Sequence, residues 1–217
     1  MKKVVVFGTK DFAQLAFFYL QHDSPYEVVA FSVNQTYLGA ATSFEGLPLV
    51  PFEVVEKIYS PEQYAFFVPM APTRMNKDRE KIYLEAKQKG YELISYVSSR
   101  STVYSNNQIG ENCFIWENNT FQPYAIIGNN VTVCTGNIIG HHVLVGDHVF
   151  LANAVLTGHV TVGSYCFFGV GTSVREGVTI AAGTYVAMNS AVVADTEPWS
   201  VYRGHIAAKQ EKSSLEM

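Results

Sequence analysis

Residues 127–151 read IGNNVTVCTGNIIGHHVLVGDHVFL, and an apolar residue returns there at every sixth position. A period of six fits neither the 3.6-residue repeat of a helix nor the two-residue alternation of a strand. It is typical of a hexapeptide-repeat parallel β-helix, in which three steps make one triangular coil with the apolar anchors inside. The spacing extends in both directions, and the anchors are Ile109, Ile115, Phe121, Ile127, Val133, Ile139, Val145, Leu151, Leu156, Val162, Phe168, Val174, Ile180, Val186 and Val192.

The repeat has one short step and a regular pattern of small residues. Only five residues separate Leu151 from Leu156. Glycine often follows the anchor, as at Gly128 and Gly140. We expect these glycines to turn the corners through backbone angles that other residues resist. The length of the repeat predicts about five coils that begin near Val103.

Composition limits the possible functions. The 217 residues are 48% hydrophobic and 16% charged, which predicts one large or two small domains with a well-filled core. The net charge of −4 argues against a nucleic-acid-binding surface. No apolar stretch is long enough to span a membrane, and the run after Met1 is too short for a signal peptide. We therefore expect a cytoplasmic protein.

The three cysteines predict neither a metal site nor a disulfide framework. Cys113, Cys134 and Cys166 are odd in number, widely spaced and without the spacing of metal ligands. Cys113 and Cys166 occupy the small-residue position of the repeat. We interpret all three as reduced structural cysteines and expect no metal.

The first hundred residues have a different pattern, in which strands alternate with helices. This alternation predicts a parallel sheet, and hence a small Rossmann-like domain over residues 1–100. It connects through Ser98–Ser101 to the β-helix domain, residues 101–217. The segment Thr36–Pro61 is interpreted as a loop-rich crossover. The expected elements are strands at Lys3–Gly8, Tyr26–Val33, Tyr64–Val68 and Tyr91–Val97 and helices at Asp11–Gln21 and Asn76–Lys87.

The first turn between strand and helix, Gly8-Thr9-Lys10, is a candidate phosphate site. Glycines at such a turn let the backbone approach a phosphate. Only Gly8 fits the dinucleotide fingerprint, and no acidic residue for a ribose follows the second strand, where Asn34 stands. NAD is therefore not expected. The alternatives are a nucleotide-sugar crevice formed by Gly8, Thr9, Lys10 and Asn34, or a domain that only packs and orients an acceptor.

The run Gly140–Asp147, GHHVLVGD, resembles the histidine-containing coil of bacterial sugar acetyltransferases. These enzymes belong to the hexapeptide-repeat superfamily and modify sialic acids or amino sugars. The resemblance covers nearly the whole chain, because that family also joins a small Rossmann-like domain to a β-helix. It implies that the β-helix is left-handed and that acetyl-CoA is the cosubstrate. His141 matches the family's general base.

One departure from the family's pattern leaves the partner of His141 open. Members commonly place an acidic residue directly after the base, where it orients the imidazole. His142 stands there in this sequence. Asp147, Asn137, His142 itself or a backbone carbonyl are the candidates for that role. His22 lies in a polar turn and receives no role.

The resemblance also implies where coenzyme A lies, namely along the β-helix between neighbouring subunits. By motif, Gly158 and the turn Ala187–Met188 match the places that contact its pantetheine arm. Arg203 and Lys209, in the C-terminal segment, would meet its acidic groups through charge-assisted hydrogen bonds. The alternative is that this segment only caps the coil stack.

These observations predict an acetyl-CoA-dependent N-acetyltransferase that acts on a nucleotide-linked amino sugar in surface polysaccharide biosynthesis. His141 would remove the proton from the acceptor while backbone N–H groups stabilise the oxyanion. A homotrimer is expected, because flat β-helix faces pack around a threefold axis. Two alternatives stay open. One is O-acetylation of sialic acid or another sugar, and the other is a nucleotide-sugar-binding scaffold without catalysis.

Overall fold

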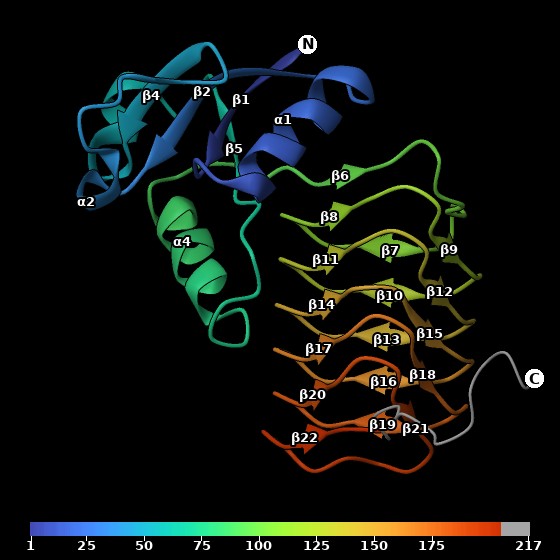
Figure 1. Cartoon of the computed structure of the whole chain (residues 1–217). Coiled ribbons are helices and arrows are strands. Elements are labelled where there is room, and N and C mark those ends of the chain that lie inside the picture. The colour runs from blue at the N-terminus through green and yellow to red at the C-terminus, as the bar shows by residue number, and fades with distance from the viewer. Residues whose placement is uncertain (205–217) are drawn as a thin grey trace, which may run out of the picture.

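The first part of the chain forms a five-stranded sheet with helices on both faces (Figure 1). The strand order is β3-β4-β2-β1-β5, and all pairs are parallel except β3 with β4. The structure, a computed structural model, describes residues 1–204. The strands are β1 (Lys2–Phe7), β2 (Tyr26–Val33), β3 (Ser43–Phe44), β4 (Leu47–Pro51) and β5 (Ala65–Phe67).

The two long helices lie on opposite faces of this sheet because alternate strand residues point to opposite sides. Helix α1 (Asp11–His22) packs Ala16 and Leu20 against Val4 and Val6 of β1. On the other face, α4 (Lys77–Gln88) packs Ile82, Tyr83 and Ala86 against Val5, Phe66 and their neighbours. The shorter elements are α2 (Gln35–Leu38), the 3₁₀ turn η1 (Phe52–Val54) and α3 (Val55–Ile58).

Two details of this part differ from the sequence-based prediction. The segment Thr36–Pro61, expected to be a loop-rich crossover, contains more regular structure than predicted, because it supplies β3, β4, η1, α3 and most of α2. The segment Tyr91–Val97 does not form the predicted continuous strand of the N-terminal sheet. Leu93 makes a single bridge to Phe66, and β6 (Tyr96–Val97) pairs with a strand of the β-helix. The division into residues 1–100 and 101–217 stays a prediction.

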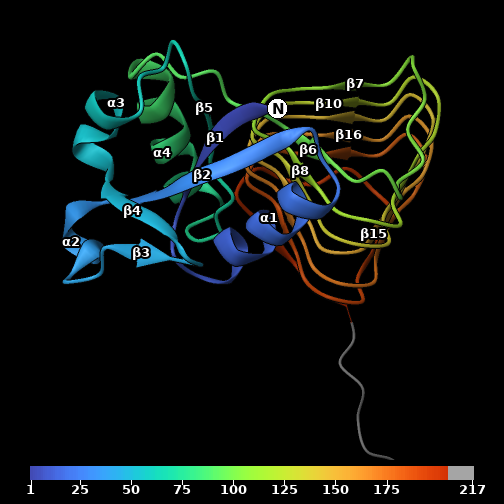
Figure 2. The same cartoon turned by 90° about the horizontal axis from the view of Figure 1, so that it is seen from above.

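The six-residue repeat forms a three-sided parallel β-helix, as predicted (Figures 1 and 2). We name its sides by their first strands. The β6 face has the order β6-β8-β11-β14-β17-β20-β22, the β7 face β7-β10-β13-β16-β19 and the β9 face β9-β12-β15-β18-β21. The strands are β7 (Gln108–Ile109), β8 (Phe114–Ile115), β9 (Thr120–Phe121), β10 (Ile126–Ile127), β11 (Thr132–Val133), β12 (Ile138–Ile139), β13 (Leu144–Val145), β14 (Phe150–Leu151), β15 (Ala154–Leu156), β16 (Thr161–Val162), β17 (Phe167–Phe168), β18 (Thr172–Val174), β19 (Thr179–Ile180), β20 (Tyr185–Val186), β21 (Ala191–Val192) and β22 (Val201–Tyr202).

The predicted anchors form the core of the β-helix. Every anchor from Ile115 to Val192 is at most 5% exposed, and Ile109 packs at the edge of the same cluster. The short step between Leu151 and Leu156 is absorbed at Asn153, which has a φ of 94°. The side chain of Asn137 accepts hydrogen bonds from the backbone N–H groups of Asn153 and Ala154 at 3.1 and 2.6 Å. The coil therefore stays in register although one residue is missing.

The glycines that follow the anchors are required for a physical reason other than the one expected. Positive φ angles fall three residues after the anchor, as at Asn130 (56°), Gly136 (78°) and His142 (57°). Gly140 has no such angle, but a Cβ there would lie 2.7 Å from the backbone nitrogen of Gly158 in the next coil. These glycines are therefore required by the close approach of successive coils, and the prediction that they turn the corners was wrong.

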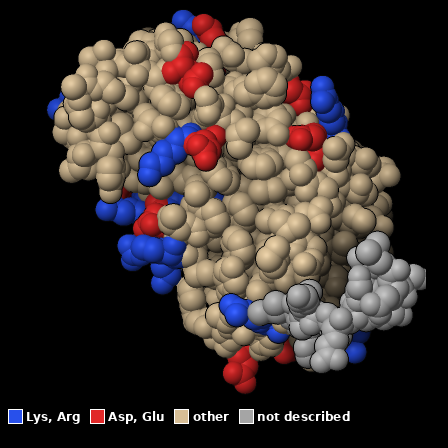
Figure 3. Space-filling view, viewed as in Figure 1, with Lys and Arg blue, Asp and Glu red and all other residues tan. Residues whose placement is uncertain are grey.

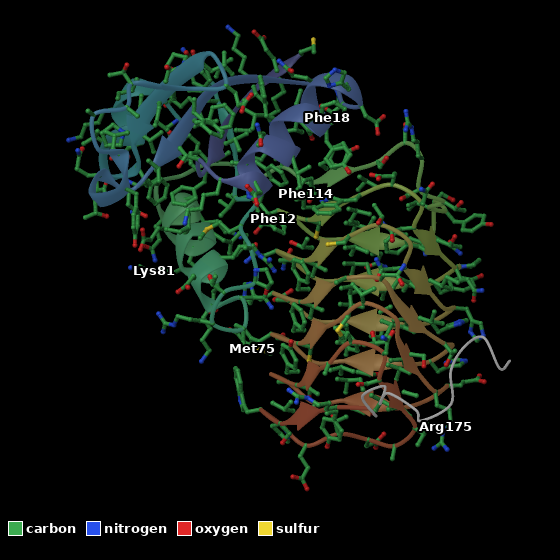
Figure 4. All side chains as sticks on the ribbon, viewed as in Figure 1. Phe12, Phe18, Met75, Lys81, Phe114 and Arg175 are labelled. Carbon is green, nitrogen blue, oxygen red and sulfur yellow. The ribbon has the colours of Figure 1, made fainter. Side chains whose placement is uncertain are left out.

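The N-terminal part covers the β6 face with aromatic side chains. The ring of Phe12 from α1 lies 5.8 Å from that of Trp116 and 6.1 Å from that of Phe150. Phe67 meets Phe114 edge to face at 5.4 Å, and Phe12 and Phe114 come together between α1 and this face (Figure 4). The β7 and β9 faces have no such cover within residues 1–204. No helix among these residues is long and apolar enough to span a membrane.

Candidate active site

Two corners of the β-helix carry histidines at the same backbone position. We call the corner between the β9 and β7 faces the histidine corner. Its positive-φ residues are Tyr124, His142, His159 and Gly177. We call the corner between the β7 and β6 faces the covered corner. Its positive-φ residues are Asn112, Asn130, His148, Tyr165, Gly183 and Trp199.

His141 lies on the histidine corner, in the turn between β12 and β13. Its backbone N–H donates to Oε1 of Gln122 at 2.9 Å, and its carbonyl accepts from the N–H of His159 at 3.0 Å. Its side chain is exposed, and its Nδ1 lies 3.2 Å from Nδ1 of His142. One of these two nitrogens must therefore be protonated and the other must accept. When the Nδ1 of His141 carries that proton, its Nε2 keeps the lone pair that a base requires.

Aromatic stacking holds the neighbours of His141. The ring of His142 lies between Tyr124, 4.8 Å away, and His159, 4.9 Å away, and is nearly parallel to both. The ring of His141 meets that of His159 edge to face at 5.0 Å. The sequence-based analysis gave His159 and Tyr124 no role. His159 follows His142 by 17 residues, and Tyr124 precedes His142 by 18 residues. Each distance is the length of one coil, and this spacing is the sequence signal that identifies them.

Gly158 lies directly under the His141 ring. A Cβ at this position would be 2.5 Å from Cε1 and 2.6 Å from Nε2 of His141. The backbone N–H of Gly158 has no hydrogen-bond partner among residues 1–204. The corner thus packs the exposed imidazole of His141 against the backbone of Gly158, whose N–H has no partner within the described part of the chain. These are the two groups that acyl transfer requires, one to take a proton and one to stabilise an oxyanion.

Two candidates for orienting His141 have other partners. Asn137 is buried and donates from its side chain to Oδ1 of Asn119 and to the carbonyl of Cys134. Asp147 accepts from the backbone N–H of Asn129 at 2.6 Å. Among residues 1–204, neither side chain forms a hydrogen bond to His141. His142 is the candidate that the structure brings next to it.

The covered corner holds its histidine in a buried network under α4. His148 is 7% exposed, and its Nδ1 lies 2.9 Å from Nδ2 of Asn130. Its Nε2 lies 3.6 Å from Glu80, which also accepts from the hydroxyl of Tyr165 at 2.7 Å. Burial lowers the pKa of His148, although the nearby carboxylates of Glu80 and Asp147 oppose the shift. This histidine is therefore held neutral inside the protein.

Arg79 of α4 is the most deeply buried charge beside this corner. Its guanidinium donates to the backbone carbonyls of Met70, Asn130 and Val149 and to the side chain of Asn130. Within residues 1–204 the hydrogen bonds of this guanidinium go to carbonyl groups and not to a carboxylate. Burial lowers the pKa of Arg79 to about 10. Further along the same helix, Lys77 lies 4.6 Å above the ring of Trp199. Helix α4 therefore closes this corner over most of its length (Figure 1).

The residues predicted to bind coenzyme A lie in two places. Ala187, Met188 and Arg203 line an open cavity of about 580 Å³ at the corner between the β6 and β9 faces. The other lining residues are Ala152, Phe167, Gly169, Val170, Tyr185, Asn189 and Gly204. Gly158 lies on the histidine corner, at the opposite edge of the β9 face. One chain does not bring these residues together, and Lys209 lies outside the described residues.

The predicted nucleotide site lies where β1 and β2 end side by side. Gly8 follows β1 with a φ of 108°, and Lys10 is exposed at the N-terminus of α1. Asn34 follows β2, and its side chain donates to Glu53 at 3.3 Å. Thr9 lies between Gly8 and Lys10. The structure thus places Gly8, Thr9, Lys10 and Asn34 at one end of the sheet.

Glu53 is a carboxylate at this site that sequence reasoning missed. It accepts from the backbone N–H of Gln35 at 3.0 Å. Burial alone would raise the pKa of Glu53, but these hydrogen bonds and the charge of Lys89 lower it overall. Glu53 follows β4, the strand that the sequence pattern did not reveal. For this reason an acidic residue beside the end of β2 was thought to be absent.

The cysteines are free thiols, as predicted. Cys113 and Cys166 are buried, and Cys134 is partly buried. Burial raises the pKa of Cys113 and Cys166 to about 11 and that of Cys134 to about 12. A nucleophilic cysteine needs a lowered pKa, so these three have structural positions.

Comparison with known proteins supports the fold over nearly the whole chain. The acetyltransferase domain of PglB from Neisseria gonorrhoeae superposes with a TM-score of 0.81 at 21% identity, covering 94% of this chain and 97% of that one. PerB from Caulobacter crescentus, in complex with CoA and GDP-perosamine, gives a TM-score of 0.81 at 24% identity, covering 93% and 94%. At these identities the likeness concerns the fold.

Sequence relatives match a shorter part of the chain. An acyl-[acyl-carrier-protein]–UDP-N-acetylglucosamine O-acyltransferase from Helicobacter pylori is 31% identical over 112 residues, which are 48% of this chain and 42% of the relative. The enzyme of the same name from Sinorhizobium fredii is 29% identical over 113 residues, with the same coverage. The chain spans less than half the length of these curated relatives, and no protein-family model matches it. The comparisons therefore establish a parallel β-helix fold, shared with solved acetyltransferases from the N-terminal sheet to the last coils.

Proposed function

We propose that this protein is an acetyl-CoA-dependent N-acetyltransferase of a nucleotide-linked amino sugar. The observation that carries the proposal is the exposed imidazole of His141 over Gly158, whose N–H has no partner among the residues that the structure describes. The solved neighbours support the substrate classes. PglB was solved with acetyl coenzyme A and PerB with CoA and GDP-perosamine. The sequence relatives are acyltransferases of another nucleotide sugar.

In the proposed reaction, His141 and Gly158 act on opposite ends of one addition step. The acceptor nitrogen forms a bond to the thioester carbon while Nε2 of His141 takes its proton. The N–H of Gly158 donates to the oxyanion that develops on the carbonyl oxygen. The C–S bond then breaks, and the imidazolium of His141 returns the proton to the departing thiolate. His142 accepts from Nδ1 of His141 and holds the ring, in the place where the resembling family has an acid.

We further propose that the site is completed by a second copy of the chain, in a homotrimer. The histidine corner and the cavity at Ala187, Met188 and Arg203 lie at opposite edges of the β9 face. The side chains that point outward on the β7 and β9 faces carry no charge, and Ile126, Ile138 and Leu144 among them are exposed. The view in Figure 3 shows charged side chains mainly on the N-terminal part and few over the β-helix. Uncharged faces that expose aliphatic side chains are typical of subunit interfaces.

The reaction is tested by measuring thiol release from acetyl-CoA in the presence of nucleotide-linked amino sugars. We expect at least one of them to raise the release far above that seen without acceptor. The same sugars without an amino group are the matched controls. Release with hydroxyl acceptors alone would replace the proposal by O-acetylation, and binding without release would replace it by a scaffold. A stable monomer in sedimentation would contradict the trimer.

The acceptor's nucleotide is proposed to bind at Gly8, Thr9, Lys10 and Asn34. Reversing the charge with Lys10→Glu should raise the apparent KM for the acceptor and leave that for acetyl-CoA unchanged. Added salt should reduce the difference, because Lys10 is exposed. Lys81→Glu, on the exposed side of α4, is the control (Figure 4). Unchanged acceptor kinetics for Lys10→Glu would move the acceptor away from this turn.

A further inference from the structure

Three imidazoles meet on the histidine corner, although the sequence-based analysis predicted no metal site. One ring nitrogen each from His141, His142 and His159 lies within 4.8 Å of the other two. Two of these residues are adjacent in sequence, and the third comes from the next coil. All three side chains are exposed, and no hydrogen bond or ion pair joins them to a carboxylate within residues 1–204. The cluster is therefore accessible and has nitrogen ligands only.

We infer that His141, His142 and His159 form a binding site for a transition-metal dication of the Zn²⁺ class. Neutral imidazole is a preferred ligand of Zn²⁺, Co²⁺, Ni²⁺ and Cu²⁺. Three protein nitrogens leave the fourth position of a tetrahedral ion to water, as in open zinc sites. No other group of three His, Cys, Asp or Glu side chains with this spacing occurs within residues 1–204.

The distances are close to those that a metal ion needs. With metal–nitrogen bonds of about 2.0–2.1 Å, two nitrogens on a tetrahedral ion lie roughly 3.3 Å apart. The Nδ1 atoms of His141 and His142 are already 3.2 Å apart. The nitrogen of His159 has to move closer by turning its ring out of the parallel stack with His142. An exposed ring can turn in this way without disturbing the core.

The backbone brings the three residues to one place before any ion arrives. His142 and His159 hold the same turn position in successive coils, with φ angles of 57° and 59°. The N–H of His159 donates to the carbonyl of His141 at 3.0 Å, which fixes the spacing of the two turns. Gly158 leaves the space that the His141 ring occupies. Binding therefore requires rotation of side chains and no change in the coil.

The consequence for the reaction rests on the proposed function. A metal ion bound through Nδ1 of His141 leaves the proton of the neutral ring on Nε2, so Nε2 no longer has the lone pair that would take the acceptor's proton. Bound Zn²⁺ is therefore expected to inhibit acetyl transfer, and a chelator is expected to restore it. The site would make the enzyme sensitive to free zinc.

Metal binding is measured first, on the full chain without acetyl-CoA or acceptor. Titration calorimetry with Zn²⁺ should show one ion per chain at micromolar concentrations, and Co²⁺ should give the visible absorption of a low-coordinate nitrogen site. Loss of a partner outside the ligand shell already costs about 10–100-fold in metal affinity, so loss of a ligand should cost at least as much. His142→Asn and His159→Asn test this, because asparagine is found at the same backbone position in Asn112 and Asn130.

The control is His22→Asn, an exposed histidine on α1 that lies against Phe18. It should bind Zn²⁺ as the unaltered chain does. Absence of binding in the unaltered chain, or equal binding in all three variants, would overturn the site.

The inhibition is measured separately, as thiol release with and without Zn²⁺ and chelator. Failure to find any acetyl acceptor would refute the proposed function, while the calorimetry would still decide the metal site. Zinc binding without inhibition of an active enzyme would refute the link between the two. Weaker inhibition of His159→Asn than of the unaltered chain is the expected result, because this variant lacks one ligand and keeps His141.

Discussion

The histidine corner and the covered corner have the same backbone and similar residues but opposite environments. His142 and His148 both have positive φ angles in the same coil, and each stacks on an aromatic or imidazole ring of a neighbouring coil. His148 is buried under α4 and bonded to Asn130, whereas His142 is exposed and paired with His141. The residue types alone therefore do not determine the role. The segment that packs on the corner decides which histidine is exposed to solvent.

The largest expected effect is on the histidine corner. Replacing His141 with Asn should reduce turnover by roughly 10²–10⁴-fold, the usual contribution of a positioned general base. Coenzyme A binding, measured by calorimetry, should change little. His22→Asn is the control and should keep full turnover. Near-normal turnover of His141→Asn would remove His141 from the role, and a complete loss in His142→Asn alone would assign the base to His142.

A change on the covered corner should act on stability instead. Arg79→Met removes the donor to three backbone carbonyls. Within residues 1–204 this leaves the carbonyl of Asn130 buried and unpaired, whereas that of Val149 keeps the N–H of Thr132 and that of Met70 is only partly buried. A buried unpaired carbonyl costs about 1–3 kcal/mol, so the free energy of unfolding should fall by about that amount. Urea denaturation at one protein concentration measures this, with Lys81→Met on the exposed side of the same helix as the control. A loss below about 1 kcal/mol would show that water replaces the guanidinium.

Most of the fold could be predicted because the repeat encodes it locally. The anchors are one apolar residue in six, and the structure buries nearly all of them. The first strand, the second strand and both long helices also agree with their predicted ranges within one or two residues. The strands β3 and β4 were missed because Pro48 and Pro51 interrupt a short apolar run at the sheet edge. The corner glycines were misinterpreted because sequence cannot separate a positive φ from close contact between coils.

The candidate site was less predictable, because its residues meet only through the register of the coils. Position after the anchor and its glycine identified His141. His159 lies 18 residues after His141, and it joins it because the short step at Asn153 keeps the turns aligned. The cover of His148 depends on α4, whose Glu80 and Arg79 come from a distant part of the chain. No local pattern contains that information.

Two glycines in successive coils of the histidine corner allow smaller effects on turnover and on stability to be separated. In Gly158→Ala the new methyl group would meet the exposed His141 ring, which can turn aside. Turnover should therefore fall by roughly 10–100-fold, as for a catalytic group displaced by about 1 Å, while stability changes little. In Gly140→Ala the methyl group would meet the backbone of Gly158 at 2.7 Å, so this variant should lose stability. Equal losses of stability in both would show that the His141 ring cannot move.

The smallest expected effect is the pH dependence that His148 gives to stability. Burial lowers the pKa of His148 below the ordinary value of 6.5. The charges of Glu80 and Asp147 raise this pKa, whereas the charge of Arg79 lowers it further. The unfolded chain therefore binds the proton more readily, and stability is lost as the pH falls below about 6.5 and through the lower pKa of the folded state. His148→Asn, which copies Asn130 of the preceding coil, should reduce the slope of unfolding free energy against pH in this range. An identical slope in His148→Asn would show that the buried ring contributes nothing to it, and that the two corners differ in packing alone.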